Sequence, residues 1–145
     1  MIMISWHELI ERATLLNPAI RQQSYKLTLW EGAPVGHELM CIWNALEVAE
    51  SIPGAQVLIG VQVLAGQVLQ HHAAVLDPDG ITAWEVTYSK LFDPIAFRAI
   101  PVKPKVLRRW GITATSEQAR ESAELDESPE EFEARYGSQC VVHRA

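Results

Sequence analysis

Residues 55–88 read AQVLIGVQVLAGQVLQHHAAVLDPDGITAWEVTY, and this stretch decides the fold of the chain. It is rich in Val, Ile, Leu and Thr, and turn signals at Gly66 and at residues 77–80 divide it into three apolar segments. Because the gaps between them are too short for a parallel crossover, the three segments are expected to form an antiparallel meander. The expected strands are residues 55–65, 68–77 and 81–88.

Two helices are expected before the meander. Apolar residues recur at helical spacing over Trp6–Leu16. Residues 37–50 carry apolar side chains on more than one face, which is typical of a buried helix. Residues 24–29 alternate weakly and predict a short strand, and Gly60 inside the first strand of the meander indicates a β-bulge. The pattern predicts an α+β fold with N-terminal helices packed on an antiparallel β-meander.

The chain after the meander divides into two parts. Residues 91–110 contain three prolines and are expected to be irregular. Two helices are expected beyond them, over residues 115–125 and 129–136. This organisation predicts an α+β core domain over residues 1–112 and an acidic helical tail over residues 113–145.

The formal net charge of −6 is concentrated towards the C-terminal end. Residues 117–135 hold eight acidic and two basic residues, whereas residues 97–111 hold five basic residues and no acidic one. The basic stretch is expected to pair with the acidic tail or to be solvated, and a contact with an acidic partner is the alternative. The overall negative charge argues against binding of nucleic acid or of anionic membranes.

The composition excludes several classes of protein. Hydrophobic residues make up 48% and charged residues 21%, as in soluble globular proteins. The longest apolar run, residues 57–65, is too short to cross a bilayer, so no membrane-spanning segment is expected. The N-terminus lacks the pattern of a signal peptide. Two cysteines are too few for a disulfide scaffold, and a reducing cytoplasm is the expected location.

Cys41 is the candidate nucleophile. It lies near the start of the expected buried helix, where backbone amides and the helix dipole favour the thiolate form that attacks carbonyl carbons. The alternative is a small core residue that packs like alanine, because cysteine outside disulfides is among the most buried residue types. A thiol nucleophile also needs a base and a group that orients that base.

The candidate base and its orienting group lie on neighbouring strands. His71 and His72 point to opposite faces of the second strand, and Glu85 lies on the third. A two-residue turn within residues 77–80 would place Glu85 opposite His72, with Cβ atoms roughly 5 Å apart. A type I turn with a glycine bulge would instead place Glu85 on the face of His71. Either register gives one histidine a carboxylate partner.

Four short motifs occur in this order: Cys41-Ile42-Trp43-Asn44-Ala45, His72-Ala73, Asp77-Pro78-Asp79-Gly80 and Glu85-Val86-Thr87. Together they resemble small cysteine hydrolases of the papain/transglutaminase type, over about a third of the chain. The resemblance implies Cys41 as nucleophile, His72 as base and Glu85 as orienting group, in a papain-like arrangement. The chain departs from that pattern in two ways. Ala74 stands where an aromatic residue is expected, and the acid is Glu rather than Asp, one place further along.

Three further residues are candidates for substrate binding. Asn44 lies one helical turn after Cys41 and either supports an oxyanion or, as we expect, bonds to a neighbouring loop. Gln62 interrupts an apolar strand and faces either the site or solvent. His71 is the other histidine of the strand pair, and His37 is the runner-up base. No Cys-x-x-Cys, His-Glu-x-x-His or Gly-rich phosphate loop occurs, so we expect no metal and no cofactor.

Two functions follow from these patterns. The first is a cysteine hydrolase or acyl-transfer enzyme that acts on a peptide, amide or ester through Cys41, His72 and Glu85. The second is a non-catalytic protein-binding or inhibitor protein. In that case Cys41 belongs to the core, and the acidic tail and basic stretch contact a protein partner or a second copy of the chain.

Overall fold

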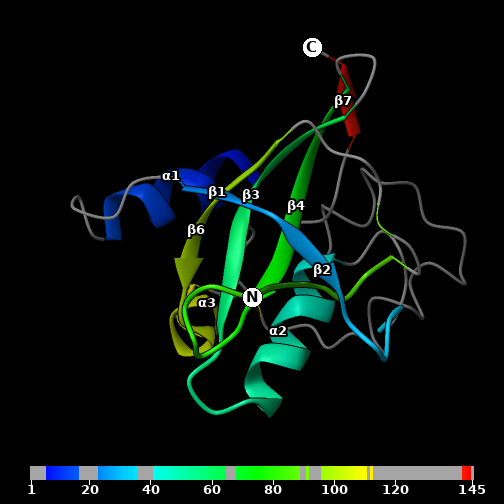
Figure 1. Cartoon of the computed structure of the whole chain (residues 1–145). Helices are drawn as coiled ribbons and strands as arrows, with labels where there is room; N and C mark the ends of the chain where they lie inside the picture. Colours follow the sequence, from blue (N-terminus) through cyan, green and yellow to red (C-terminus); the bar gives the residue numbers. More distant parts are fainter. Residues whose placement is uncertain are drawn as a thin grey trace, which may run out of the picture.

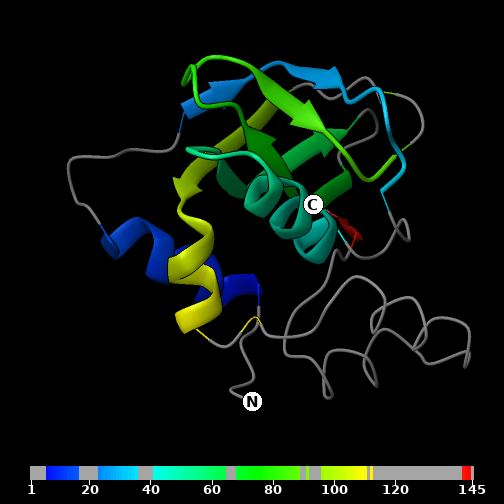
Figure 2. The same ribbon diagram turned by 90° about the horizontal axis from the view of Figure 1, so that it is seen from below.

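A curled sheet of strands occupies the centre of the computed structural model, and helices pack on one side of it (Figures 1 and 2). The model describes residues 6–16, 23–35, 41–64, 68–88, 91, 96–110, 112 and 142–144. Its helices are α1 (Trp6–Leu16), α2 (Cys41–Ser51) and α3 (Pro104–Arg109). Its strands are β1 (Gln23–Tyr25), β2 (Leu27–Leu29), β3 (Gln56–Leu64), β4 (Val68–Leu76), β5 (Ala83–Glu85), β6 (Ala96–Val102) and β7 (Val142–Arg144).

The predicted α+β class and the antiparallel meander are confirmed. Strands β3, β4 and β5 follow one another in the sheet, and each pairs antiparallel with the next. Helix α1 spans the predicted residues Trp6–Leu16. Helix α2 contains all the described residues of the second predicted helix, since residues 37–40 lie outside the described part.

A single stretch of chain, residues 23–29, joins the two ends of the sheet. The strand order is β1-β6-β3-β4-β5-β2, with β7 paired to β4 off this path. Strand β1 pairs antiparallel with β6 and strand β2 pairs parallel with β5, although only Lys26 separates β1 from β2. The first and last strands of the order are therefore consecutive in sequence, and the sheet curls round on itself (Figure 1, blue strands).

The side chains of the sheet alternate between two hydrophobic cores. The outer core lies between the sheet and the helices, and it includes Val57 of β3 and Ala73 of β4. The inner core lies on the other face, inside the curl, and it includes Leu58 of β3 and Ala74 of β4. Because adjacent residues of a strand point to opposite faces, each of the long strands contributes to both cores.

The described residues 96–109 are mostly regular, contrary to the expectation that residues 91–110 are irregular. They contain β6, which pairs with β3 over seven residue positions, and α3. The prolines fit these elements for local reasons. Pro104 is at the start of α3, where no intrahelical N–H bond is lost. Pro101 lies beyond the part of β6 that pairs with the described residues of β1, and a proline is tolerated where a strand edge is not paired.

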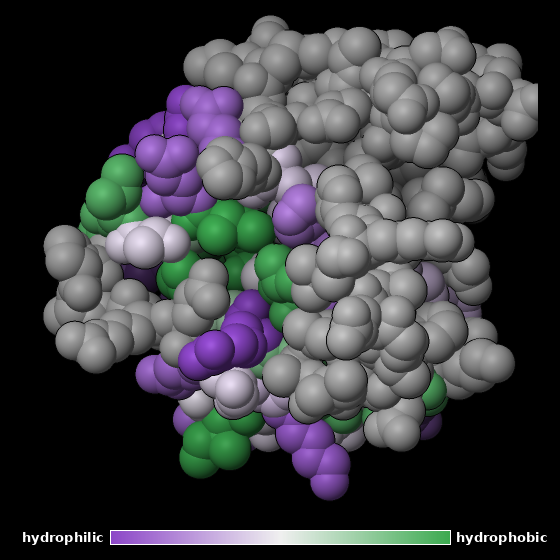
Figure 3. Space-filling model, turned by 90° about the horizontal axis from the view of Figure 1, so that it is seen from above, coloured by the Kyte–Doolittle hydropathy of each residue, from purple (hydrophilic) through white to green (hydrophobic). Residues whose placement is uncertain are grey.

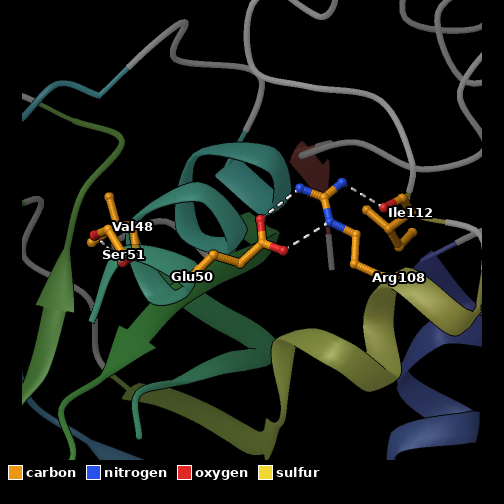
Figure 4. A network of polar contacts seen from close by, with 5 residues as sticks. All are labelled: Val48, Glu50, Ser51, Arg108 and Ile112. Atoms are coloured by element: carbon orange, nitrogen blue, oxygen red, sulfur yellow. Dashed lines mark hydrogen bonds and ion pairs between the residues drawn. The ribbon is translucent and has the colours of Figure 1, made fainter. Parts of the chain in front are cut away.

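One basic residue of the stretch 97–111, Arg108, forms an ion pair with the core domain. Arg108 of α3 donates two hydrogen bonds to the carboxylate of Glu50 on α2, at 2.6 and 3.1 Å, and a third to the backbone oxygen of Ile112 at 2.9 Å (Figure 4). The contact ties α3 to the end of α2. The predicted tail helices lie outside the described residues, so pairing between the tail and the basic stretch stays a prediction. The described residues near the C-terminus form β7, which pairs with the start of β4.

Gly60 does not form a bulge, contrary to the expectation. The pairing of β3 runs without interruption through Gly60 on both sides, to His72 of β4 and to Ala99 of β6. Glycine is needed there because β6 comes very close. A Cβ at Gly60 would lie 1.9 Å from the backbone oxygen of Arg98 and 2.7 Å from the Cα of Ala99.

Gly60→Ala is expected to destabilise the protein by about 3 kcal/mol, because the new methyl group can be accommodated only if β3 and β6 move apart. Urea denaturation followed by circular dichroism measures the change. Gly80→Ala is the matched control. Its backbone has a φ of 74°, but nothing lies within 4 Å of its Cβ position, so it should cost only about 1 kcal/mol. Equal losses in the two variants would contradict the close approach of the strands.

The turn between β4 and β5 is longer than predicted, and Asp79 organises it. One carboxylate oxygen of Asp79 accepts hydrogen bonds from the backbone nitrogens of Ile81 and Thr82, both at 2.8 Å. The other accepts one from the Thr82 hydroxyl at 2.7 Å. These bonds hold residues 81 and 82 in the turn, so β5 begins at Ala83 rather than at Ile81.

The same bonds, chiefly the backbone hydrogen bond from Thr82, lower the pKa of Asp79 below its usual 3.8. A lowered folded-state pKa means that the carboxylate stabilises the fold above about pH 4, and that this contribution is lost as the pH falls through the folded-state value. Asp79→Ala should therefore lower the melting temperature at pH 7 and have a smaller effect at about pH 2. A difference in melting temperature that stays constant across this range would contradict the assignment.

Candidate active site

A buried histidine–carboxylate pair lies on the inner face of the curled sheet. The Nε2 atom of His72 on β4 lies 2.7 Å from the Oε1 atom of Glu85 on β5, and both side chains are almost completely buried. The second carboxylate oxygen accepts a hydrogen bond from the backbone nitrogen of Thr87 at 3.0 Å. The carboxylate is thus fixed by the backbone and in turn holds the imidazole ring. The predicted pairing of these two residues is confirmed.

The register that brings them together differs from both predicted registers. Val75 pairs with Trp84 and Leu76 with Ala83. Extended by one further step, this register places Glu85 opposite Ala74, so Glu85 reaches His72 diagonally along the same face. The shift from the tight-turn register is two residues. A shift by an even number of residues keeps every side chain on its face of the sheet, so Glu85 still meets His72, as in the tight-turn register.

His71 points to the other face and does not share this carboxylate. Its ring stacks on the indole of Trp6 from α1, with ring centroids 5.5 Å apart and planes 11° from parallel. The ring is therefore on the face of the sheet that the helices cover. The alternative register, with His71 as the partner of Glu85, is wrong.

Aromatic residues surround the ring of His72. Tyr88 stacks on it at a centroid distance of 5.7 Å, and Phe97 of β6 meets it edge to face at 5.6 Å. Neither residue was among the sequence candidates. Phe97 lies in a segment expected to be irregular, and no sequence spacing links either residue to His72.

Two buried polar atoms of this region have no hydrogen-bond partner among the described residues: the Nδ1 atom of His72 and the Oε1 atom of Gln62. Gln62 is 2% exposed, so the solvent-facing alternative for it is wrong. It lies two residues after Gly60, the strand partner of His72, and on the same face of β3. Buried polar atoms are nearly always paired in proteins, which makes these two groups candidates for contact with a bound molecule.

Asn44 connects helix α2 to the carboxylate. Its side-chain nitrogen donates to the hydroxyl of Thr87 at 3.3 Å, and the backbone nitrogen of Thr87 donates to Glu85. A continuous chain of polar contacts therefore runs from the first turn of α2 to His72. The expected structural bond of Asn44 is confirmed. Thr87 was visible in the sequence only as the last residue of the motif Glu85-Val86-Thr87.

Cys41 is the first residue of α2, one helical turn before Asn44. It is completely buried and belongs to the outer core, together with Ala73 of β4, whereas His72 lies on the inner face of that strand. Its sulfur is part of a disulfide. The chain's other cysteine is Cys140, which lies outside the described residues. In this state the sulfur is not a thiolate, so nucleophilic chemistry at Cys41 requires the reduced form.

Comparisons with known proteins identify no relative of this chain: no family model, no curated protein and no solved structure matches it. Within the described residues, no group of three or more His, Cys, Asp or Glu side chains could hold a metal ion. No described helix is long and apolar enough to span a membrane. The runner-up base, His37, lies outside the described residues.

Glu85→Ala is expected to destabilise the protein by about 3 kcal/mol or more, because it leaves His72 Nε2 and the Thr87 backbone nitrogen buried without a partner. Glu85→Gln should cost less, since its amide oxygen still accepts one of these bonds. Equilibrium denaturation at pH 7 measures both. A fully tolerated Glu85→Ala would show that the pair contributes nothing to the fold.

Proposed function

We propose that this protein, with Cys41 reduced, is a cysteine hydrolase or acyl-transfer enzyme that acts on an amide or ester. The observation that carries the proposal is the way His72 is held. Glu85 occupies its Nε2 atom, and its Nδ1 atom has no hydrogen-bond partner among the described residues. An imidazole fixed by a carboxylate at one nitrogen and open at the other is what a general base requires.

The proposed reaction requires a rearrangement that brings the Cys41 sulfur from the outer core to Nδ1 of His72, which lies on the inner face of β4. Nδ1 then takes the proton of the Cys41 thiol, and the thiolate attacks the carbonyl carbon of the substrate. The backbone amide of Cys41, at the N-terminus of α2, stabilises the negative charge on the carbonyl oxygen. His72 then returns the proton to the departing amine or alcohol, which leaves an acyl group on Cys41. Water or another acceptor removes that group with His72 again acting as base.

The polar contacts between Asn44, Thr87 and Glu85 support this arrangement. They connect the turn of α2 that begins at Cys41 with the strand that carries the acid, around the end of β5. In this proposal Asn44 positions the helix, Glu85 positions His72, and Gln62 offers a buried oxygen to a substrate N–H group. This is the papain-like order of nucleophile, base and acid.

The test is alkylation of Cys41 by iodoacetamide at about pH 6.5 after reduction with dithiothreitol, followed by mass spectrometry of the labelled peptide. Labelling of the native protein should be fast, and His72→Asn should slow it about 100-fold, the usual contribution of a general base. His71→Asn is the matched control and should leave the rate unchanged, because His71 stacks on Trp6 on the other face.

If reduced Cys41 reacts only when the protein unfolds, the hydrolase proposal fails. Equal effects of His71→Asn and His72→Asn would also exclude His72 as the base. Release of p-nitrophenol from p-nitrophenyl acetate, with one equivalent released in a burst, provides the independent measure of acylation.

The complete burial of Cys41 and its disulfide favour a second candidate function, a non-catalytic binding protein in which both features are structural. On the upper face of the molecule, hydrophobic side chains are visible between hydrophilic ones (Figure 3). Such a surface suits contact with a protein partner. The alkylation experiment separates the two functions, since a binding protein needs no reactive thiol.

A further inference from the structure

A pocket of about 460 Å³ lies where β2 ends beside β5, and two of its lining residues are tryptophans. We call it the Trp30–Trp84 pocket, lined by Leu29, Trp30, Glu31, Gly32 and Trp84. The parallel pairing of β2 and β5 places Thr28 opposite Trp84, and Trp30 lies two residues after Thr28 on the same face. The backbone nitrogen of Trp30 also donates to the oxygen of Glu85 at 2.9 Å. The two indoles thus come from neighbouring strands.

The two indole rings form adjoining walls. Their centroids are 5.3 Å apart and their planes meet at 75°, so the edge of one ring contacts the face of the other. The Trp84 nitrogen donates to the carboxylate of Asp77 at 3.3 Å, which fixes the orientation of that ring. The Trp30 ring lies against Gly32, where a Cβ would be 3.3 Å from the ring nitrogen. Both rings are also partly buried and pack against the outer core, which limits their motion before a ligand binds.

The charge beside these rings is negative. Glu31 is exposed and lines the pocket, and no lysine or arginine is among the lining residues. The face of an indole ring also carries negative potential, which attracts cations more strongly than any other aromatic side chain does. Both the carboxylate and the rings thus favour a ligand that is positively charged and has an apolar surface.

We propose that the Trp30–Trp84 pocket binds an alkylated ammonium group. Its positive charge faces Glu31, and its methyl or methylene groups contact the two indoles. A small quaternary ammonium solute and the methylated side chain of a lysine in another protein share this chemistry. The proposal is independent of Cys41 and His72, because the pocket is lined by neither.

The test compares choline with 3,3-dimethylbutan-1-ol, which has the same shape but no charge. Each is titrated into the ¹⁵N-labelled protein, and the indole N–H signals of Trp30 and Trp84 are followed by NMR. Choline should shift both signals in a saturable way, and the neutral alcohol should bind about tenfold more weakly, as expected when cation–π and carboxylate contacts are lost. Equal affinity for the two probes would overturn the proposal.

Variants locate the site. Trp30→Ala and Glu31→Gln should each weaken choline binding by about fivefold or more, whereas Trp30→Phe should retain most of it because an aromatic face remains. Glu47→Gln on α2 is the control, since Glu47 is exposed but does not line the pocket. If Glu47→Gln weakens choline binding as much as Glu31→Gln, the attraction is only that of the overall negative charge, and the proposal fails.

Peptides distinguish the two sources of the ligand. A short peptide with a trimethyl-lysine, tested against the same peptide with unmodified lysine and with norleucine, should bind more tightly than choline if the ligand is a protein side chain. If choline and the trimethyl-lysine peptide bind with equal affinity, the rest of the peptide adds nothing, and the ligand is a small quaternary ammonium solute. Binding of the norleucine peptide as tightly as the trimethyl-lysine peptide would show that the pocket selects apolar surface rather than a cation, and would overturn the proposal.

Discussion

Residues 23–29 pair with β6 at one end and with β5 at the other, and the remaining architecture depends on this double pairing. Without it the sheet would have two open edges and a face with no layer to cover it. With it the sheet curls, and its inner face becomes a second core in addition to the one beneath the helices. Gly60 lies on the inner face of this sheet, where β6 comes too close to β3 for any side chain at that position.

An enclosed inner face makes polar groups there costly unless they are paired. His72 and Glu85 satisfy that requirement through each other and through the backbone of Thr87. The pairing is incomplete, however, since Nδ1 of His72 has no hydrogen-bond partner among the described residues. A purely structural pair would be expected to satisfy both ring nitrogens, and this difference favours a chemical role for His72.

Cys41 has two features that bear on the proposed chemistry in opposite ways. Its helix contacts the acid-bearing strand through Asn44 and Thr87, and the proposed arrangement of nucleophile, base and acid relies on this contact. Its sulfur lies in the outer core and in a disulfide, so the oxidised form has no thiol to offer. Under the proposed hydrolase function, the redox state of Cys41 decides whether the site has a thiol available.

The sequence by itself determined the features that depend on neighbouring residues. Periodicity predicts the bounds of α1, and short turns predict the antiparallel meander. Side-chain alternation predicts that one of His71 and His72 meets Glu85, and only the resemblance to cysteine hydrolases favours His72. The observed register differs by two residues from the tight-turn register and by one from the bulged-turn register, so it keeps His72, and not His71, on the face of Glu85.

Only the tertiary structure decided the features that depend on residues far apart in the chain. The pairing of β6 with β3 overrode the prolines that favoured irregular chain, and the close approach of Arg98 gave Gly60 a role other than a bulge. The burial of Cys41, the packing of Tyr88 and Phe97 against the ring of His72, and the contact between Trp30 and Trp84 also depend on residues far apart in the chain. Such contacts leave no periodic trace in the sequence, because they are set by how distant strands pack rather than by what lies next to each residue.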